Sequence, residues 1–401
     1  MRIGFLSLPL SGHLNPMTAL ARNLQSRGYE VEFFGLLDNA AAFRDSTLQF
    51  MPYAEEECPL GFVAQTWAPV TRMHGMDIIR YAFEHINPKL LGATLLRLPD
   101  KIKASRIEGM VIDAAFVFSE LVPLALEIPF AQTWLVLHPD PSARTPPSTT
   151  SWPDERTPEA LERNARDLQD LGGLFALSVP VAATFAKQYS LEIDWQTPGS
   201  TSSRLAVITQ TPQAFDFPEV HYPGPFHYTG PFTDNEGRTP ISFDWEKLDE
   251  RPLVYASLGT LTNGLTQIHK AILATAAHMP EIQLVFSIGA NVDAEDLGPF
   301  PPNAVVVTSA PQLALLKRAC LCITHAGLNT ALEALSEGVP MVAIPVGYDQ
   351  PGVASRIVYH GVGVFIEVNG VTPDSLQACV QHVLNTPSYR DQARSFQKIL
   401  V

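Results

Sequence analysis

The sequence predicts an α/β protein in which two doubly wound domains face each other across a cleft. Its 401 residues suffice for two domains of ordinary size. Residues 2–34 are expected to form a strand, a helix and a strand, and a right-handed crossover makes the two strands parallel. A polar, turn-rich segment over residues 231–249 is followed from residue 253 by a second series of this kind. Two parallel sheets joined by a linker are therefore expected.

The chain begins with an apolar strand, expected over residues 2–9. A helix is expected to open at Asn15 and Pro16, because proline is favoured in the first turn and apolar residues at helical spacing follow it. The next strand is expected over residues 30–34. The turn between the first strand and the helix lacks a G-x-G-x-x-G pattern, which disfavours a dinucleotide-dependent oxidoreductase.

Two polar residues follow strands of this first half. His13 lies in the turn after the first strand, and Asp113 ends the apolar run over residues 110–112. The carboxyl ends of parallel strands meet at one edge of a sheet, so the two side chains are expected to lie together. An aspartate bonded to an imidazole fixes its tautomer and stabilises the imidazolium formed on proton uptake. A lone histidine here would cap a helix or a loop, whereas its pairing with Asp113 favours a catalytic role.

Apolar residues between the strands of the first half fit either a core or a pocket for an apolar molecule. They include Met76 and Phe83 in an irregular stretch, and Trp134 further along. Composition alone does not separate the two interpretations. The uncharged run over residues 171–186 is broken by a proline and is too short for a bilayer span, so we expect it to be buried or to line the pocket.

The charge balance and the cysteines narrow the class of protein. The chain has 27 basic and 41 acidic residues, a net charge of −14, and no basic cluster, which argues against a nucleic-acid partner. An anionic ligand therefore needs a local positive site such as a helix N-terminus. None of the four cysteines forms a C-x-x-C pair, so a reducing, cytoplasmic location is expected.

The most informative stretch is residues 309–350. An apolar strand over residues 320–323 ends before His325 and Gly327, and Asn329 is expected to cap the following helix. This places polar side chains at the positive end of a helix and at a strand's carboxyl end, where open α/β sheets bind phosphates. The alternative is an ordinary turn with polar caps.

Residues around this helix suit other parts of a nucleotide sugar. Glu333 lies one turn into the helix, where a carboxylate can accept hydrogen bonds from ribose hydroxyls. Asp349 and Gln350 follow the next strand and offer a carboxylate and an amide to sugar hydroxyls. The strand that starts at residue 253 runs into a small-residue turn, whose amides and Thr260 hydroxyl can meet the same diphosphate.

These motifs resemble the donor-binding signature of the family-1 UDP-glycosyltransferases, which have the GT-B fold. The matching residues are Pro311–Gln312, Thr324-His325-x-Gly327-x-Asn329-Thr330-x-x-Glu333, Gly338–Met341 and Asp349–Gln350. With Ala326 and Leu328, the stretch is most similar to bacterial carotenoid and macrolide glucosyltransferases. The resemblance extends from residue 3 to about residue 385.

The resemblance implies a role for each matching residue. Gln312 lies beside the uracil, Glu333 holds the ribose, and the sugar is held by Asp349 and Gln350. The diphosphate meets His325, Asn329 and Thr330. His13 is the general base and Asp113 its partner. The other expected donor-binding residues are Gly12, Ser257, Gly259, Thr260, Pro311 and Gly327, and the expected acceptor-binding residues are Met76, Phe83 and Trp134. Ser309 stands where plant members stack a tryptophan on uracil, so stacking on the base is weaker here or comes from another residue.

The expected organisation is an acceptor-binding domain over residues 1–230, a linker over 231–249, a donor-binding domain over 250–385 and a short C-terminal helix over 386–401. The expected reaction is inverting transfer of a sugar, glucose above others, from a UDP-sugar to a hydroxyl of an apolar small molecule such as a carotenoid, a flavonoid or phenol, or a macrolide. The UDP-sugar is a co-substrate, and no D-x-D motif after a strand calls for a divalent metal ion.

Two other functions remain open at this point. One is a sugar-nucleotide epimerase of similar two-domain build, which needs no apolar acceptor pocket. The other is a non-catalytic protein that binds a nucleotide sugar. No transmembrane segment is expected, and peripheral contact with a membrane stays open as a variant of the transferase.

Overall fold

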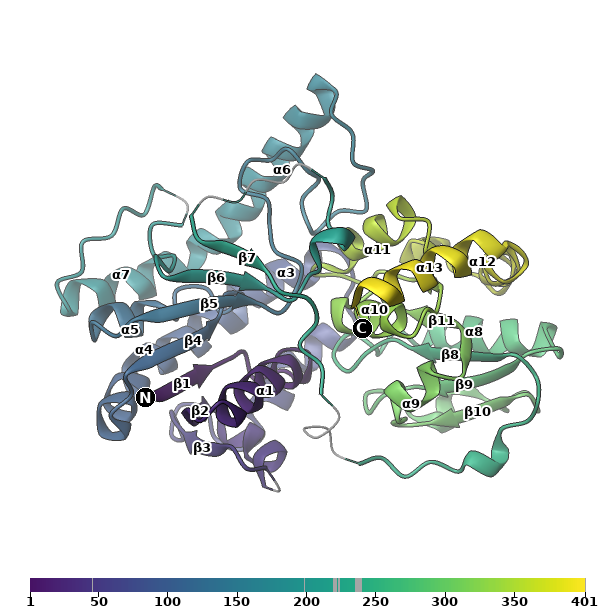
Figure 1. Ribbon diagram of the computed structural model, residues 1–401, viewed down its shortest axis with the longest axis horizontal. Coiled ribbons are helices and arrows are strands. Elements are labelled where there is room, and N and C mark those ends of the chain that lie inside the picture. Colours follow the sequence, from purple (N-terminus) through teal and green to yellow (C-terminus); the bar gives the residue numbers. More distant parts are fainter. Residues whose placement is uncertain (45, 198, 219–221, 223, 235–239, 401) are drawn as a thin grey trace.

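In a computed structural model the chain forms two parallel sheets that lie side by side (Figure 1). The structure describes residues 1–44, 46–197, 199–218, 222, 224–234 and 240–400. The predicted linker over residues 231–249 lies partly outside the described residues, because these omit 235–239. The predicted fold class is confirmed.

The first sheet has the strand order β3-β2-β1-β4-β5-β6-β7. Its strands are β1 (Arg2–Leu6), β2 (Glu30–Gly35), β3 (Gln49–Pro52), β4 (Gly109–Asp113), β5 (Phe130–Trp134), β6 (Ala206–Thr209) and β7 (Phe226–Tyr228). All neighbouring pairs are parallel. The chain starts at β1, extends to one edge and returns to β4, so the order reverses between β1 and β4. Such a switch point is where open α/β sheets bind ligands.

The second sheet repeats this plan in the order β10-β9-β8-β11-β12-β13. Its strands are β8 (Leu253–Ser257), β9 (Gln283–Ser287), β10 (Ala304–Val307), β11 (Ala319–Thr324), β12 (Met341–Ala343) and β13 (Gly363–Phe365). The switch point here lies between β8 and β11. Each half therefore has one expected ligand-binding edge.

Helices cover both faces of the sheets. In the first half they are α1 (Ser11–Ser26), α2 (Phe62–Trp67), α3 (Met76–Tyr81), α4 (Asn87–Ser105), α5 (Leu121–Ala125), α6 (Pro158–Phe175) and α7 (Val179–Gln188). In the second they are α8 (Thr266–His278), α9 (Gln312–Leu316), α10 (Leu328–Ser336), α11 (Gln350–Tyr359), α12 (Pro373–Asn385) and α13 (Pro387–Leu400). Successive strand residues enter different cores: Phe5 packs with Met17 of α1, while Leu6 joins the opposite face. Both faces of a parallel sheet are buried in this way.

The core around α10 and α11 also contains two residues of the first half. Leu137 and Phe215 pack among the side chains of the second sheet and its helices. The ring of Phe215 lies 6.0 Å from that of Phe396 in α13. The C-terminal helix therefore contacts a residue that precedes the linker.

The first helix begins four residues earlier than its proline predicts. α1 starts at Ser11, so that His13 lies in its first turn and Pro16 lies inside it. A proline has no backbone N–H, and Pro16 therefore leaves the carbonyl oxygen of Gly12 without its usual helical donor. The predicted start was wrong because proline usually marks the first turn of a helix, whereas Pro16 lies inside this one.

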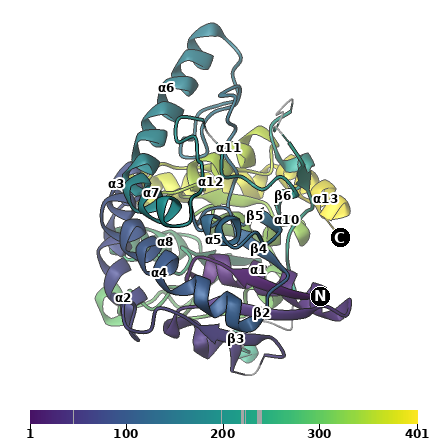
Figure 2. The ribbon, with the colours of Figure 1, turned by 90° about the vertical axis from the view of Figure 1, so that its left-hand side faces the viewer.

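The segment Pro158–Gln188 is long and apolar enough to cross a membrane, by length and composition alone. It consists of α6, one turn over Ala176–Ser178, and α7. Only 22% of its most apolar window is buried in the structure. Figure 2 shows α6 projecting from the body of the molecule. Within residues 171–186 the buried residues are Leu171, Ser178, Ala182, Phe185 and Ala186, so the expectation of burial is wrong for most of that run, and the alternative that it lines a pocket stays a prediction.

Candidate active site

His13 and Asp113 meet at the switch point of the first sheet. His13 lies in the first turn of α1 directly after β1, and Asp113 is the last residue of β4, the strand beside β1. Nδ1 of His13 lies 2.8 Å from Oδ2 of Asp113. A carboxylate only accepts hydrogen bonds, so Nδ1 carries the proton and Nε2 keeps its lone pair. This tautomer is the one that a general base requires.

The backbone around β1 and β4 holds the Asp113 carboxylate in place. Oδ2 accepts hydrogen bonds from the N–H of Leu8 at 3.1 Å and the hydroxyl of Ser7 at 3.3 Å, and Oδ1 accepts one from the N–H of Ala115 at 3.0 Å. Asp113 is fully buried. A buried carboxylate with this many donors presents a fixed negative charge to the imidazole.

The electrostatic surroundings favour a proton on His13. Burial of the ring lowers the pKa of His13, but the charge of Asp113, its hydrogen bond and the charge of Asp349 more than offset this. The pKa of His13 therefore lies above its ordinary value. Because Asp349 belongs to the second half of the chain, both halves act on the same imidazole.

The second switch point is built around the ring of His325. His325 follows β11, and its ring lies between the backbones of Gly259, which follows β8, and Gly327. A Cβ atom would come within 2.6 Å of the ring at Gly259 and within 2.5 Å at Gly327, so both positions require glycine. Loss of hydration lowers the pKa of His325 to about 4, which leaves the ring neutral. Its Nδ1 is buried and has no hydrogen-bond partner in the described part of the chain.

The helix after this turn begins two residues earlier than predicted. Gly327 is the N-cap of α10, and Asn329 and Thr330 are its second and third residues. The first N–H groups of a helix have no partner within it and carry partial positive charge. The backbone reaches this start through Ala326, whose φ of 63° is unusual for a residue other than glycine. The predicted capping role of Asn329 is wrong.

Asn329 instead joins the two halves of the chain. Its Nδ2 donates to the carbonyl oxygen of Gly12 at 2.7 Å, and its Oδ1 accepts from Nε2 of Gln210 at 2.7 Å. The Gly12 carbonyl is available for this bond because Pro16 cannot donate to it. The first turns of α1 and α10, which belong to different halves of the chain, are thus in direct contact.

Two further contacts join the two halves of the chain. The hydroxyls of Ser11 and Thr260 lie 2.7 Å apart. Oδ2 of Asp349 accepts from the N–H of Leu137 at 2.7 Å, and burial raises the pKa of Asp349. The hydroxyl of Ser257 accepts from the N–H of Gly259 at 3.3 Å.

Gln312 is turned toward Glu333. Pro311 is the N-cap of α9 and Gln312 its first residue. Nε2 of Gln312 donates to Oε2 of Glu333 at 2.6 Å and to the Thr330 hydroxyl at 3.3 Å, while its Oε1 accepts from the hydroxyl of Tyr255 at 3.0 Å. The structure thus brings the residue predicted to lie beside the uracil into contact with the residue predicted to hold the ribose.

Gln350 supports the turn that carries Asp349. Its Oε1 accepts from the N–H groups of Val346 at 2.8 Å and Gly347 at 3.0 Å, and Gln350 is 6% exposed. Tyr348 within this turn has a φ of 55°. The side-chain oxygen predicted for the sugar is therefore engaged in holding the loop.

The three predicted acceptor-binding residues differ in their surroundings. Phe83 is 8% exposed and packs on Phe175 of α6, with ring centroids 4.7 Å apart. Met76 opens α3 and is 38% exposed. Trp134 ends β5 and is partly buried. Phe83 thus belongs to a small core cluster with Leu171, whereas Met76 faces solvent.

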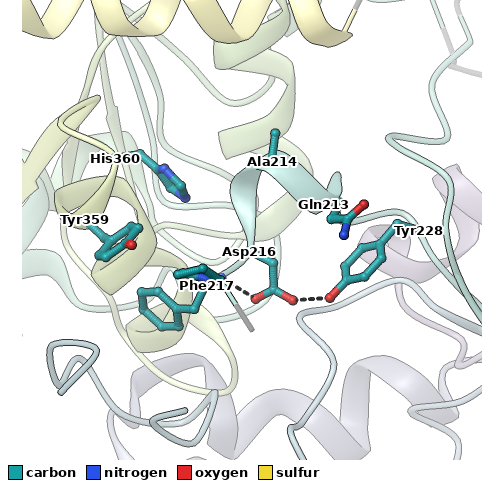
Figure 3. A pocket seen from close by; sticks show the side chains of 8 residues that line it. Gln213, Ala214, Asp216, Phe217, Tyr228, Tyr359 and His360 are labelled. Carbon is teal, nitrogen blue, oxygen red and sulfur yellow. Dashed lines mark hydrogen bonds between the residues drawn. The ribbon is translucent and has the colours of Figure 1, made fainter. Parts of the chain in front are cut away.

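A pocket of about 420 Å³ lies beside the C-terminal end of α11 (Figure 3). Asp216, Tyr228 and His360 are among the residues that line it, and the hydroxyl of Tyr228 donates to Oδ2 of Asp216 at 2.7 Å. None of the sequence-predicted site residues lines this pocket. Among the described residues, no group of three or more His, Cys, Asp or Glu side chains could hold a metal ion.

Sequence reasoning missed four residues at this site: Ser11, Leu137, Gln210 and Tyr255. Gln210 directly follows β6, so the strand-end rule that singled out Asp113 would have found it. Leu137 contributes a backbone N–H, which no side-chain pattern reveals. Tyr255 lies in a strand where a buried aromatic residue looks like core.

The sequence is similar to those of known glycosyltransferases. The family model described as "UDP-glucoronosyl and UDP-glucosyl transferase" matches residues 196–399. A zeaxanthin glucosyltransferase from Pantoea ananas is 28% identical over 88% of this chain and 82% of its own length. The NDP-glycosyltransferase YjiC from Bacillus subtilis (strain 168) is 33% identical over 50% of this chain and 52% of its own.

The fold also matches solved structures. The glycotransferase of kitacinnamycin has a TM-score of 0.72 and 24% identity, and the match covers all of this chain and 94% of that chain. At this identity the likeness concerns the fold alone, and it agrees with two doubly wound domains of the GT-B type.

Proposed function

Because this chain belongs to the family of UDP-glucoronosyl and UDP-glucosyl transferases, we propose that it moves glucose from UDP-glucose to a hydroxyl of an apolar small molecule, with inversion. It is a glycosyltransferase whose co-substrate is a nucleotide sugar. One observation carries the proposal: the His13–Asp113 pair lies at the start of α1, and the Asn329–Gly12 hydrogen bond of 2.7 Å joins the start of α1 to the start of α10.

The acceptor half supplies the base. Nε2 of His13 takes the proton of the acceptor hydroxyl as its oxygen attacks the anomeric carbon. The imidazolium that forms is stabilised by the fixed carboxylate of Asp113. Attack from the side opposite the leaving diphosphate inverts the anomeric configuration, and no covalent enzyme intermediate is required.

The donor half stabilises the leaving group. The diphosphate gains negative charge as the bond between the sugar and the diphosphate breaks. The N-terminal amides of α10 carry partial positive charge and face the leaving diphosphate. Gly259 and Gly327 let the backbone approach closely. Glu333 holds the ribose and Asp349 the sugar. With a net charge of −14, the protein binds this anion through local groups and not through its overall field.

The choice of glucose and of an apolar acceptor is supported by the relative that is named a zeaxanthin glucosyltransferase. A carotenoid, a phenol such as a flavonoid, and a macrolide all present a hydroxyl on an apolar body. We place the enzyme in the cytoplasm, and cell fractionation tests this together with peripheral membrane binding.

The experiment is a UDP-release assay with UDP-glucose or dTDP-glucose against a panel of hydroxylated apolar acceptors. We expect acceptor-dependent release with UDP-glucose, and a loss of about 100-fold or more in His13→Ala. The control is His278→Ala, which changes an exposed histidine at the end of α8.

Release that persists in His13→Ala would contradict the assigned base. A free epimer formed without acceptor would favour the epimerase, and nucleotide-sugar binding without turnover would favour a binding protein.

A further inference from the structure

The hydrogen bonds around Gln312 form a chain of three residues. The hydroxyl of Tyr255 in β8 contacts Oε1 of Gln312 at 3.0 Å, and Nε2 of Gln312 contacts Oε2 of Glu333 in α10 at 2.6 Å. Tyr255 and Glu333 are almost completely buried, at 1% and 2% exposed. The chain therefore joins the centre of the second sheet to the carboxylate proposed to bind ribose.

Only one arrangement of the protons satisfies all three groups. The carboxylate of Glu333 only accepts hydrogen bonds, so the nitrogen of the Gln312 amide must face it. The amide oxygen then faces Tyr255, whose hydroxyl must act as donor. The reverse orientation of the amide would place its oxygen against the carboxylate, which is repulsive. The Tyr255 hydroxyl thus selects the amide orientation that Glu333 needs.

We propose that Tyr255 is a positioning residue that, through Gln312, fixes the Glu333 carboxylate for recognition of the ribose hydroxyls of the donor nucleotide. The inference rests on the proposed function, in which Glu333 holds the ribose. It assigns a role to a strand residue that lies behind the site and touches no substrate. A buried hydroxyl is costly unless it forms hydrogen bonds, and the contact with Gln312 satisfies that of Tyr255 together with hydrogen bonds to the side chains of Ser257 and Ser287.

Geometry makes this effect specific to the sugar of the nucleotide. Glu333 lies in the second turn of α10, while the proposed function assigns the diphosphate to the first turn. A shift of the Glu333 carboxylate therefore changes contacts to the 2′- and 3′-hydroxyls before it changes contacts to phosphate. The affinity ratio between UDP and 2′-deoxy-UDP, which share the base and the diphosphate, measures this contact alone.

The experiment is isothermal titration calorimetry with UDP and 2′-deoxy-UDP. For the wild type we expect UDP to bind about tenfold more tightly, the effect of one hydrogen bond to a charged group. In Tyr255→Phe, which keeps the ring and removes the hydroxyl, we expect the ratio to fall to about threefold or less. Gln312→Leu provides a second test of the same chain, and it carries the conclusion if Tyr255→Phe does not fold.

The matched control is Tyr53→Phe. Tyr53 is also 1% exposed, and its hydroxyl lies 3.2 Å from that of Thr94 in the first half of the chain. This variant loses a buried hydroxyl of the same kind, so its stability changes while its UDP preference stays at the wild-type ratio. A stability effect alone would lower the affinity for both nucleotides equally.

Glu333→Gln distinguishes the assignment of Glu333 to the ribose from the positioning role of Tyr255. Loss of the UDP preference in Glu333→Gln, with a reduced ratio in Tyr255→Phe, supports the positioning role. Loss in Glu333→Gln with the full ratio kept in both Tyr255→Phe and Gln312→Leu overturns that role and leaves the proposed function intact. A wild type that binds both nucleotides equally, or neither, overturns the ribose assignment and the positioning role together.

Discussion

At the scale of single residues, the pair of His13 and Asp113 governs how activity depends on pH. His13 acts as a base only when it is neutral, and Asp113 and Asp349 raise its pKa. Activity is therefore lost as the pH falls through this raised pKa, and we expect the acid limb of kcat/KM above pH ~6.5.

Asp113→Asn tests this electrostatic origin. Removal of the negative charge lowers the pKa of His13, so the acid limb moves to lower pH. An asparagine can also stabilise the wrong tautomer, and we expect the maximal rate to fall about 100-fold or more. The measurement is kcat/KM between pH 5 and 9. A limb that stays at the wild-type pH would contradict the assignment of the limb to His13.

A second residue-scale prediction concerns Gly259. Gly259 and Gly28 both have positive φ, 75° and 89°, but only Gly259 has a side chain in the path of a Cβ atom. Alanine at either position costs about 1–2 kcal/mol of backbone strain. Alanine at Gly259 must also displace the ring of His325, so we expect UDP affinity to fall at least tenfold in Gly259→Ala and to stay unchanged in Gly28→Ala. Calorimetric titration with UDP measures the affinity of both variants. Equal affinities would show that the close approach of the Gly259 backbone to the His325 ring has no effect on the donor site.

At the scale of elements, the turn between β12 and α11 depends on Gln350. Its side-chain oxygen accepts from two buried N–H groups, those of Val346 and Gly347. Gln350→Leu leaves both unsatisfied and should lower the free energy of unfolding by about 2–4 kcal/mol. Gln350→Glu keeps an acceptor oxygen and should lose much less. Urea denaturation of the two variants compares them, and equal stability would argue that Gln350 serves the sugar and not the turn.

At the scale of the whole molecule, one buried ion pair joins the two halves. Arg356 of α11 donates to Oδ1 of Asp216 at 2.7 and 3.0 Å, and both residues are less than 5% exposed. Burial raises the pKa of Asp216, but Arg356 and His138 hold it well below its usual range. Removing one partner of such a pair leaves a buried charge, so Arg356→Met should lower the free energy of unfolding by about 3–5 kcal/mol.

The matched control for this prediction is Arg22→Met. Arg22 also pairs with an aspartate, Asp234, through two hydrogen bonds of 2.6 and 3.0 Å, but this pair is partly exposed. Its loss should cost about 1 kcal/mol or less. Urea denaturation measures both variants. Equal losses in the free energy of unfolding would mean that burial does not determine how much the Arg356–Asp216 pair contributes to stability.

The sequence predicts features that depend on local pattern and on topology. Apolar runs bounded by turn residues predicted β1, β2, β4, β8, β11 and β12, and the strand-end rule placed Asp113 and His325 at the carboxyl ends of parallel strands. The start of α1 was misplaced because Pro16 resembles a first-turn proline. The contact of Gln312 with Glu333 joins residues 21 positions apart on two helices, and it depends on side-chain rotamers that no local pattern encodes.

The position of Leu137 and Phe215 has a consequence for hybrid enzymes. Hybrids join the acceptor half of one relative to the donor half of another, and the crossover is naturally placed between residues 231 and 249. In this chain Leu137 and Phe215 precede that crossover but pack inside the donor half. A hybrid made there would bring two foreign side chains into the donor-half core, where a mismatch in volume costs about 1–3 kcal/mol. Recombination therefore has to transfer Leu137 and Phe215 together with the second half.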